Sequence, residues 1–472
     1  MKPTTTRRQF IAASGTIAAG MLLSSESAAA FLKQNQLKKR IALVGTGVRG
    51  MKFWAEFVLK NYSDVVQFVA LSDINEGRLK YAKEYLKLDV PVYTNFDQML
   101  DDVEIDLLFV TTVDATHDEF IIKALNRGLN VLTEKPMTTD EVKCQNIISA
   151  TKNSSGNMIM GFNYRYGKIF TRLKQMLHNK EIGEVTSVDF HWYLNTYHGA
   201  SYFRRWHGLR EKSGTLLLHK ASHHFDLLNW WIGSDPVEVH ALGSLDYYGK
   251  NNSFRGKRCM ECPHTASCKF FWDIKKDEES YNLYVKNEKY DGYIRDNCLF
   301  REEIDIFDKM ALQIKYANGV QVSYSLTTYS PYEGFRIAFN GKEGRLETWE
   351  GIPSMDEVEV DQGQIHEKEM DHTSHTKEEM AYHEIIKQIN FADFERIKVP
   401  YIRKGHWGGD TTMVDQILRG IDRNPELHHA ANFRDGSMAI LIGVAARKSI
   451  DEGRSIKIAD LTELVPKINK WG

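Results

Sequence analysis

The stretch Ile41-Ala42-Leu43-Val44-Gly45-Thr46-Gly47-Val48-Arg49-Gly50 decides the fold of this 472-residue chain. Its first four residues form a short apolar run, which predicts a buried strand. The string that follows is Gly-x-Gly-x-x-Gly. The first glycine allows a tight turn, the second lets the backbone approach a pyrophosphate, and the third lets the next helix pack on the sheet. The sequence therefore predicts a dinucleotide-binding turn formed by Gly45, Thr46, Gly47, Val48, Arg49 and Gly50.

A second apolar run, Phe68–Leu71, predicts a strand that ends at Ser72-Asp73. A carboxylate at this place accepts hydrogen bonds from an adenosine ribose and repels a 2′-phosphate, so Asp73 favours NAD over NADP. The cations Arg49 and Arg78 moderate that preference. The alternative is an ordinary aspartate that caps the following helix.

Strands and helices continue to alternate, with a strand at 105–110, a helix at 121–125 and a strand at 130–132. This order predicts a parallel sheet covered on both faces, with ligands beyond the carboxyl ends of its strands. The residues placed there are candidates for cofactor contact: Thr111, Thr112, His117, Glu134 and Lys135. Lys135, if desolvated in a cleft, is a candidate proton donor or positive anchor. The alternative is a salt bridge to Glu134 on a solvated turn.

After about residue 160 the pattern changes to longer strands with alternating apolar residues, at 185–194, 310–316 and 320–326. They predict an open, mostly antiparallel sheet with one face on a helix layer. The chain thus divides into a doubly wound parallel α/β domain of the Rossmann type over 38–160 and an α+β domain over 161–472. The second domain carries a cysteine-rich insertion at about 250–300, and the polar stretch 351–405 is expected to form surface loops with one helix.

A predicted helix at 216–230 carries His219 and His223 four residues apart, so both lie on one face. Such a pair binds a metal, serves as base and anchor, or packs in the core. Neighbouring aromatic and polar side chains suit a sugar, whose C–H faces stack on rings while its hydroxyls form hydrogen bonds. The candidates for this contact are Tyr202, Arg205, Trp206, His207, His219, His223 and His224. A core or interface role is the alternative for each.

Taken together, these motifs resemble the glucose-fructose oxidoreductase/inositol dehydrogenase (Gfo/Idh/MocA) family. The matching segments are Gly45-x-Gly47-x-x-Gly50, Thr111-Thr112 with Asp114 and His117, Glu134-Lys135-Pro136-Met137, and Gly161-Phe162-Asn163-Tyr164-Arg165. The resemblance implies that Lys135 lies beside the nicotinamide ring, that Pro136 follows a cis peptide bond, and that Asn163 and Arg165 lie at the edge of the cofactor or substrate site.

The same resemblance implies that His223 is the general acid/base. His219 stands where the family carries an aspartate, so the proton relay is open and Lys135, His219 and His223 are the catalytic candidates. The implied reaction is hydride transfer between NAD and a sugar, glycoside or polyol. One alternative is an NAD-dependent glycosidase like those of glycoside hydrolase family 109, which share this fold. Another is a noncatalytic binding protein.

Four of the five cysteines fall in the insertion: Cys259, Cys262, Cys268 and Cys298. The spacing C-x2-C-x5-C with a distant fourth thiol predicts a closed tetrahedral zinc site with a structural role. Disulfides are one alternative, because an exported protein meets oxidising surroundings. An iron-sulfur cluster is the other.

Residues 1–30 resemble a twin-arginine export signal, in which Arg7-Arg8 is followed by Phe10, a weakly apolar stretch and Ala28-Ala29-Ala30. A frayed N-terminal helix is the alternative. The signal implies periplasmic localisation and transport of the folded protein by the twin-arginine machinery. Free NAD is scarce outside the cytoplasm, so we expect a tightly held cofactor.

Charge and hydropathy narrow the class of protein further. Lys and Arg number 61 and Asp and Glu 63, so no global positive field is available for a nucleic acid. No stretch after the first thirty residues reaches the ~18 apolar residues of a membrane span. The composition therefore indicates a globular protein, and the family resemblance implies a small-molecule carbohydrate substrate. The open sheet face is a candidate surface for a homo-oligomer.

Overall fold

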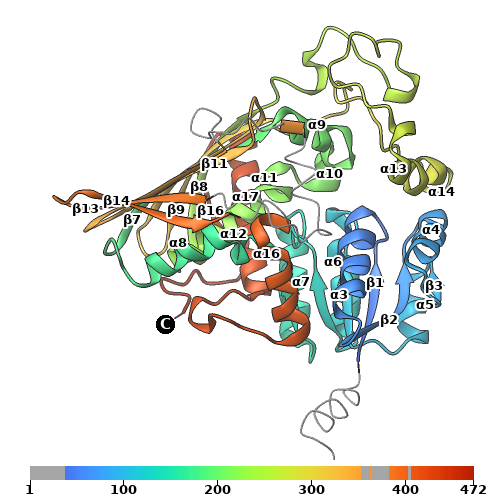
Figure 1. Cartoon of the computed structure of the whole chain (residues 1–472), viewed down its shortest axis with the longest axis horizontal. Helices are drawn as coiled ribbons and strands as arrows, with labels where there is room; N and C mark the ends of the chain where they lie inside the picture. Colours follow the sequence, from blue (N-terminus) through green and yellow to red (C-terminus); the bar gives the residue numbers. More distant parts are fainter. Residues whose placement is uncertain (1–37, 352–361, 364–381, 402–404, 472) are drawn as a thin grey trace, which may run out of the picture.

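The computed structural model describes residues 38–351, 362–363, 382–401 and 405–471. It shows two sheets, each packed against helices, in the arrangement that the sequence predicts (Figure 1). The predicted export signal lies outside the described residues. Within the described part of the chain, no helix combines the length and the apolar composition that crossing a membrane requires.

The first sheet has the strand order β15-β6-β5-β4-β1-β2-β3, and every pair in it is parallel except β15 with β6. Successive residues of β1 lie in two different hydrophobic clusters, Ile41 and Leu43 in one and Ala42 and Val44 in the other. Both faces of the central strand are therefore buried. The strands are β1 (Lys39–Val44), β2 (Val66–Ser72), β3 (Val92–Tyr93), β4 (Leu107–Val110), β5 (Asn130–Thr133), β6 (Met158–Met160) and β15 (Ala431–Asn432).

Helices cover both faces of this sheet, and several begin at a side-chain cap, as at Asn75, Asn95 and Asp140. The edge strand β15 comes from the far end of the chain, so the C-terminal part completes the first sheet. The helical elements are η2 (Arg49–Phe57), α3 (Val58–Tyr62), α4 (Glu76–Leu86), α5 (Phe96–Asp102), η3 (Asp114–Thr116), α6 (His117–Asn126) and α7 (Glu141–Asn153).

The second sheet has the order β14-β13-β12-β11-β7-β10-β9-β8-β16 and is antiparallel except for the pair β7 and β10. Exposed and buried residues alternate strictly along β9, so one face packs and the other is open. The strands are β7 (Val185–Asn195), β8 (Pro236–Ser244), β9 (Lys309–Tyr316), β10 (Gln321–Ser330), β11 (Gly334–Gly341), β12 (Gly344–Glu350), β13 (Tyr382–Ile389), β14 (Phe394–Pro400) and β16 (Ile456–Lys457).

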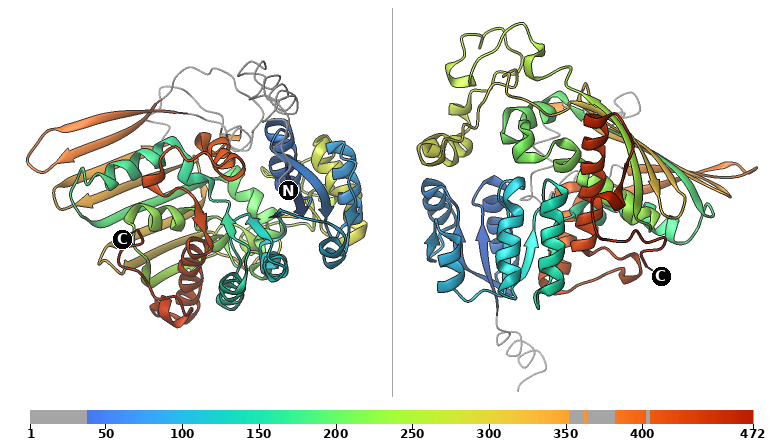
Figure 2. Two further views of the ribbon diagram at one scale, coloured as in Figure 1. Left: turned by 90° about the horizontal axis from the view of Figure 1, so that it is seen from below. Right: turned by 180° about the vertical axis from the view of Figure 1, so that it is seen from behind.

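The packed face carries α8 (Lys168–His178), α12 (Ala221–Ile232) and α17 (Phe433–Glu452), and the other face carries no helix in Figures 1 and 2. The expectation of loops and one helix over 351–405 is wrong for 382–400, which forms the hairpin β13–β14. Alternation in this stretch is weak because most of the hairpin is exposed, and apolar residues such as Ile389 and Phe394 also face solvent. Residues 352–361, 364–381 and 402–404 lie outside the described residues.

Shorter elements connect the two sheets. The helix predicted over 216–230 is interrupted at Lys220, which separates α11 from α12. The connecting elements are η4 (Asn163–Tyr166), α9 (Thr196–Arg204), η5 (Trp206–Gly208), α10 (Arg210–Ser213), α11 (Leu216–His219), α16 (Gly405–Val414), η10 (Asp415–Arg419), η11 (Pro425–Leu427) and η12 (Ile458–Asp460).

The insertion leaves the second sheet after β8 and returns to it at β9. Between them it crosses to the first domain, where α13 and α14 lie beside α4 (Figures 1 and 2). Its elements are η6 (Gly249–Asn251), η7 (Cys259–Glu261), η8 (Ile274–Lys276), α13 (Glu278–Leu283), η9 (Val285–Asn287) and α14 (Glu288–Asp291). The insertion thus reaches the carboxyl ends of the parallel strands.

Candidate functional site

The glycine-rich turn follows β1 and has the geometry that a dinucleotide needs. A Cβ at Gly45 would lie 2.6 Å from the backbone of Thr111, and one at Gly50 would lie 2.1 Å from the carbonyl oxygen of Gly45. At Gly47 the nearest atom is the Tyr284 hydroxyl, 3.5 Å away. The first and third glycines are therefore required by packing, and the second leaves the open side that a pyrophosphate would approach.

The carboxylate of Asp73 supports this turn from the end of β2. Its Oδ2 accepts hydrogen bonds from the backbone N–H of Thr46 at 2.8 Å and from the Thr46 hydroxyl at 3.0 Å. Its Oδ1 accepts from the backbone N–H of Asn75 and from Arg78. Asn75, rather than Asp73, caps α4. Arg78 is also paired with Asp291 of the insertion at 2.6 Å, so two carboxylates share this cation.

His117 joins the two loops that follow β4 and β5. Its ring nitrogens lie 2.8 Å from the carbonyl oxygen of Pro136 and 3.1 Å from that of Thr112. The hydroxyl of Thr111 donates to the carbonyl oxygen of Gly45 at 2.6 Å. The peptide bond before Pro136 is cis, as the resemblance implied. His117 is buried, so its contribution is to position the loop that carries Lys135.

Glu134 is held by Arg49 and the Trp54 indole, which donate to its Oε1 at 2.6 Å and 2.8 Å. Burial raises the pKa of Glu134, but the Arg49 and Lys135 charges outweigh it and the net shift is downward. The predicted alternative, a side-chain salt bridge from Lys135 to Glu134, is not seen. Nearby, the side-chain amide of Asn163 donates a hydrogen bond to the carboxylate of Asp410 at 2.7 Å.

Lys135 points to the second domain, where it meets His219. Its Nζ lies 3.3 Å from His219 Nε2 and 3.2 Å from the His219 carbonyl oxygen. The other ring nitrogen, His219 Nδ1, lies 2.6 Å from Oδ2 of Asp114. A consistent assignment has Nδ1–H donating to the carboxylate and Nε2 accepting from the ammonium. Residues from η3, the loop after β5 and α11 thus form one chain of hydrogen bonds.

Burial sets the electrostatics of this group. It lowers the pKa of Lys135 to about 8, against the opposing charges of Asp114 and Glu134. It also lowers the pKa of His219 well below its usual value, and the Lys135 charge adds to the effect. The same burial raises the pKa of the Asp114 carboxyl. At neutral pH the His219 imidazole is therefore uncharged, and its Nε2 is available as a proton acceptor in the site.

His223, the histidine that the resemblance favoured, lies one turn further on and is differently placed. Its ring stacks on Tyr164 at a centroid distance of 4.1 Å, and its Nδ1 is buried without a hydrogen-bond partner. His224 points into the core, where it bonds the Tyr324 hydroxyl at 2.7 Å and stacks on Trp192. His219, His223 and His224, which the sequence placed on one predicted helix, therefore have three different surroundings in the structure.

Aromatic rings surround His219. The ring centroids of Tyr202, Trp206 and His207 lie 5.2 Å, 5.7 Å and 4.1 Å from it. Arg205 extends over Tyr202, with its guanidinium carbon 5.3 Å from the ring centroid. The predicted substrate candidates Tyr202, Arg205 and Trp206 thus gather beside the Lys135–His219 pair.

Arg165, like His224, is fully buried. It donates to both carboxylate oxygens of Asp226, at 2.8 Å and 2.5 Å, and lies 3.3 Å from Asp435. No surface is left on it for a ligand, so the geometry gives it the role of a link between η4, α12 and α17.

From the sequence, Asp114 was named only as part of the family motif and His207 only among the residues suited to a sugar, and neither was expected to touch His219. For Asp114 a signal was present, because an acidic residue stands just beyond the carboxyl end of a predicted strand, where ligands bind in such sheets. For His207 no spacing indicated the contact.

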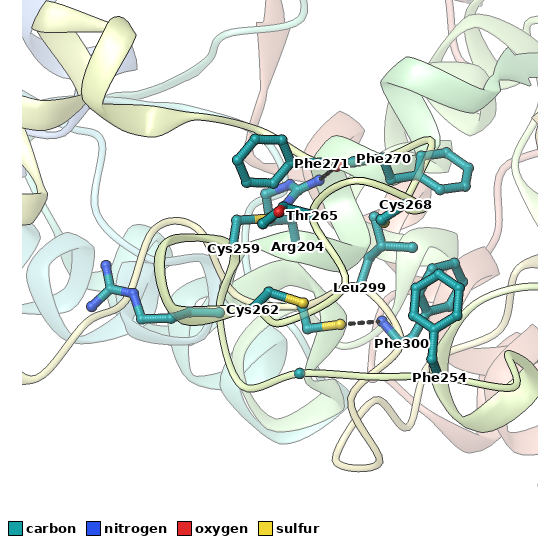
Figure 3. Close-up of a pocket in the computed structure, with 13 residues that line it drawn as sticks. Arg204, Phe254, Cys259, Cys262, Thr265, Cys268, Phe270, Phe271, Leu299 and Phe300 are labelled. Carbon is teal, nitrogen blue, oxygen red and sulfur yellow. Dashed lines mark hydrogen bonds between the residues drawn. The ribbon is translucent and has the colours of Figure 1, made fainter.

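The four cysteines of the insertion line one small cavity (Figure 3). All are free thiols, and among the described residues no group of three ligand-type side chains is arranged to hold a metal ion. Arg204 donates to the sulfur of Cys259 at 2.7 Å, and the backbone N–H of Phe300 donates to that of Cys298 at 3.4 Å. The zinc prediction is therefore open. The fifth cysteine, Cys144, is buried in α7.

Comparison with known proteins follows the same division of the chain. Residues 39–162 match the model of the oxidoreductase family NAD-binding Rossmann fold, and residues 174–458 match that of the oxidoreductase family C-terminal alpha/beta domain, both labelled GFO_IDH_MocA. A Bacillus subtilis protein named "Putative oxidoreductase YteT" is 31% identical over 443 residues, which cover 90% of this chain and 99% of that protein.

Other relatives match in part or in fold. The myo-inositol 2-dehydrogenase of Thermotoga maritima is 29% identical over 211 residues, 44% of this chain and 58% of that enzyme. The solved aldose-aldose oxidoreductase of Caulobacter crescentus is 16% identical, with a TM-score of 0.57 over 89% of this chain and all of that one. These matches are to oxidoreductases, and the glycosidase alternative finds no support among them.

Proposed function

Because the chain belongs to the Gfo/Idh/MocA oxidoreductase family, we propose that it is an NAD-dependent oxidoreductase that acts on a sugar or polyol. The observation that carries the proposal is the hydrogen-bonded chain Lys135–His219–Asp114 beside the dinucleotide turn. Relatives named inositol dehydrogenases support a polyhydroxylated substrate.

The residues present fit the cofactor. The turn from Gly45 to Gly50 would hold the pyrophosphate, and Asp73 would face the adenosine ribose. Arg78 is shared by two carboxylates, so a 2′-phosphate would meet no free cation there, which supports NAD over NADP. When bound, NAD supplies the acceptor for the hydride that leaves the substrate carbon.

The chain's own residues would handle the hydroxyl proton. A substrate hydroxyl beside Lys135 Nζ and His219 Nε2 would give its proton to this pair as the carbon is oxidised. Asp114 keeps the His219 tautomer that leaves Nε2 as an acceptor, in the manner of an aspartate that orients a catalytic histidine. Lys135, with its lowered pKa, is the group that can lose or regain a proton near neutral pH.

The insertion supports a retained cofactor. The Tyr284 hydroxyl accepts a hydrogen bond from the backbone N–H of Val48 at 2.9 Å, and Asn75 donates to the carbonyl oxygen of Asn287. Together with the ion pair between Asp291 and Arg78, these two hydrogen bonds hold the insertion over the turn. We propose that a dinucleotide leaves slowly because these contacts must open first.

A direct test is to purify the protein without added cofactor, denature it and identify any released dinucleotide by mass. We expect about one NAD per chain, and NADH formation when sugars or polyols are added to protein supplied with NAD. A protein that binds neither NAD nor NADP would contradict the proposed function. A site that is empty but binds NAD weakly would contradict only its retention.

Three further parts of the proposal rest on the sequence. Residues 1–30 would direct the folded protein through the twin-arginine machinery to the periplasm, and the open sheet face would pair with a second copy of the chain. The four cysteines would hold one structural zinc, with support from their common cavity. Each part has its own readout: cell fractionation, mass in solution and metal content.

A further inference from the structure

Two arginines at the site have no carboxylate to pair with. Arg205 lies just before η5 and Arg295 in the segment after α14. Among the described residues, neither guanidinium has a carboxylate oxygen within 4.0 Å. The Nε of Arg295 is buried and has no hydrogen-bond partner, and Arg205 Nε donates only to the carbonyl oxygen of Ser201. Against the effect of burial, Tyr284, Tyr293 and Asp277 stabilise the Arg295 charge and raise its pKa, whereas burial lowers the pKa of Arg205. Arg205 is therefore the less compensated charge, and because neither arginine has a carboxylate at ion-pair distance, both are candidates to serve a ligand.

The two guanidinium groups belong to one electrostatic cluster. The Arg295 charge, after burial, contributes to lowering the pKa of Arg205 to about 10. Both charges also lower the pKa of His207, which packs on His219. Each side chain is half-buried, so a ligand in the site can reach it.

Their packing places the pair between the reacting groups and the dinucleotide turn. Arg205 covers the ring of Tyr202, which packs on His219 at 5.2 Å. Arg295 covers the ring of Tyr284 at 4.6 Å, and that tyrosine bonds Val48 through its hydroxyl. An oxyanion held by both arginines would therefore lie within the same site as the Lys135–His219 pair.

We propose that Arg205 and Arg295 bind the carboxylate of the substrate, so that the preferred substrate is an acidic sugar, such as a uronic acid, rather than a neutral one. The inference rests on the proposed function and names its substrate class. Guanidinium groups suit this task because they present several N–H donors to a carboxylate at once.

The phosphates of the dinucleotide are the other source of an oxyanion. The N–H groups of Thr46 and Val48 donate to Asp73 and Tyr284, but the turn still offers the phosphates its other backbone N–H groups and the start of a helix. Tyr284 separates Arg295 from that turn, while Arg205 lies on the His219 side of the cluster. The geometry therefore favours the substrate as the source.

The test measures binding without turnover. Calorimetry on the full, NAD-loaded chain compares D-galacturonate with D-galactose and D-glucuronate with D-glucose, pairs that differ only in a carboxylate in place of a hydroxymethyl group. Arg205→Gln and Arg295→Gln are compared with Arg396→Gln, which removes an exposed charge from β14. Arg205→Lys and Arg295→Lys keep the charge if a glutamine variant folds poorly.

We expect each uronate to bind the unmodified protein at least about tenfold more tightly than its neutral partner, the scale of one charge-assisted hydrogen bond. Each glutamine variant should lose most of that preference, each lysine variant should keep part of it, and Arg396→Gln should keep all of it. Affinity for NAD should not change in any of them.

Equal binding of uronates and neutral sugars would overturn the inference. So would glutamine variants that lose NAD affinity instead, because the pair would then serve the cofactor phosphates. In both cases NAD binding and NADH formation by the unmodified protein would still support the proposed function, so the two failures are distinguishable.

Discussion

At the scale of single residues, the site depends on which histidine receives a partner. His219 replaces an aspartate of the family pattern, yet the carboxylate is not lost, because Asp114 supplies one from the first domain at 2.6 Å. His223 keeps its expected position in the sequence but stacks on Tyr164. We therefore propose His219, one helical turn before His223, for the acid/base role.

This shift gives a prediction about substitutions. His219→Gln should lower kcat for alcohol oxidation by about 10²–10⁴-fold, the usual contribution of a general base. Asp114→Asn should also lower kcat strongly, because an amide stabilises the wrong tautomer. The matched change His223→Gln should cost less than about tenfold. Steady-state kinetics measures kcat for each variant, and thermal melting controls for folding. A larger loss of kcat in His223→Gln than in His219→Gln would assign the acid/base role to His223.

A second prediction at this scale concerns pH. Burial lowers the pKa of Lys135 to about 8, so its amine is mostly protonated at pH 7 and mostly free above pH 8. If the free amine helps to take the hydroxyl proton, kcat/KM for oxidation should rise with pH and level off above about 8. Lys135→Met should abolish this rise of kcat/KM with pH, together with most of the activity. A flat profile through this range would exclude Lys135 as the titrating group.

At the scale of elements, the insertion joins the two domains. Its helices α13 and α14 lie on α4 of the first domain, whereas its cysteines gather around a cavity near α9 of the second (Figure 3). Burial raises the pKa of the Cys268 thiol, and a metal that binds thiolates would oppose this effect.

The zinc proposal predicts about one zinc per chain by elemental mass spectrometry. Cys262→Ser should lose the metal and lower Tm, because one of four ligands is gone. Cys144→Ser, which changes the buried thiol of α7, should keep the zinc and serves as the control. Protein without zinc in which alkylation finds the four thiols paired as disulfides would contradict the proposal.

At the scale of the whole molecule, a buried charge network links the two sheets. Arg165 of η4, which follows the last parallel strand β6, binds Asp226 of α12 and lies 3.3 Å from Asp435 of α17. Lys470 near the C-terminus pairs with the same Asp435 at 2.6 Å. One hydrophobic cluster also contains Val44 of the first sheet and Phe190 of the second, so the domains share a core rather than meeting only at a surface.

Removing one member of this network should destabilise the fold. Asp226→Asn leaves the Arg165 charge buried without its main partner, and we expect the free energy of unfolding to fall by about 3–5 kcal/mol. Glu384→Gln, in the exposed pair with Arg396, should cost about 0–1 kcal/mol. Denaturant unfolding measures both. Equal costs would mean that Arg165 contributes little to stability and is available for another role.

The sequence by itself determined the fold class, the dinucleotide turn, the strand-end positions of Lys135 and Asp73, and the family. These features follow from short-range patterns: glycine spacing, apolar periodicity and residues that end strands. The strands at 382–400 escaped this reasoning because the hairpin is largely exposed and apolar residues also stand at its exposed positions, which weakens the alternation.

Only the tertiary structure decided how distant segments meet at the site. It brought Asp114 to His219 across 105 residues of chain, placed Tyr284 of the insertion on the backbone of Val48, and buried Arg165 against Asp226. It also left Arg205 and Arg295, whose charges act on one another, with no carboxylate oxygen within 4.0 Å among the described residues. The physical reason is that hydrogen bonds and charge pairs between distant segments depend on packing in space, which no local spacing along the chain encodes.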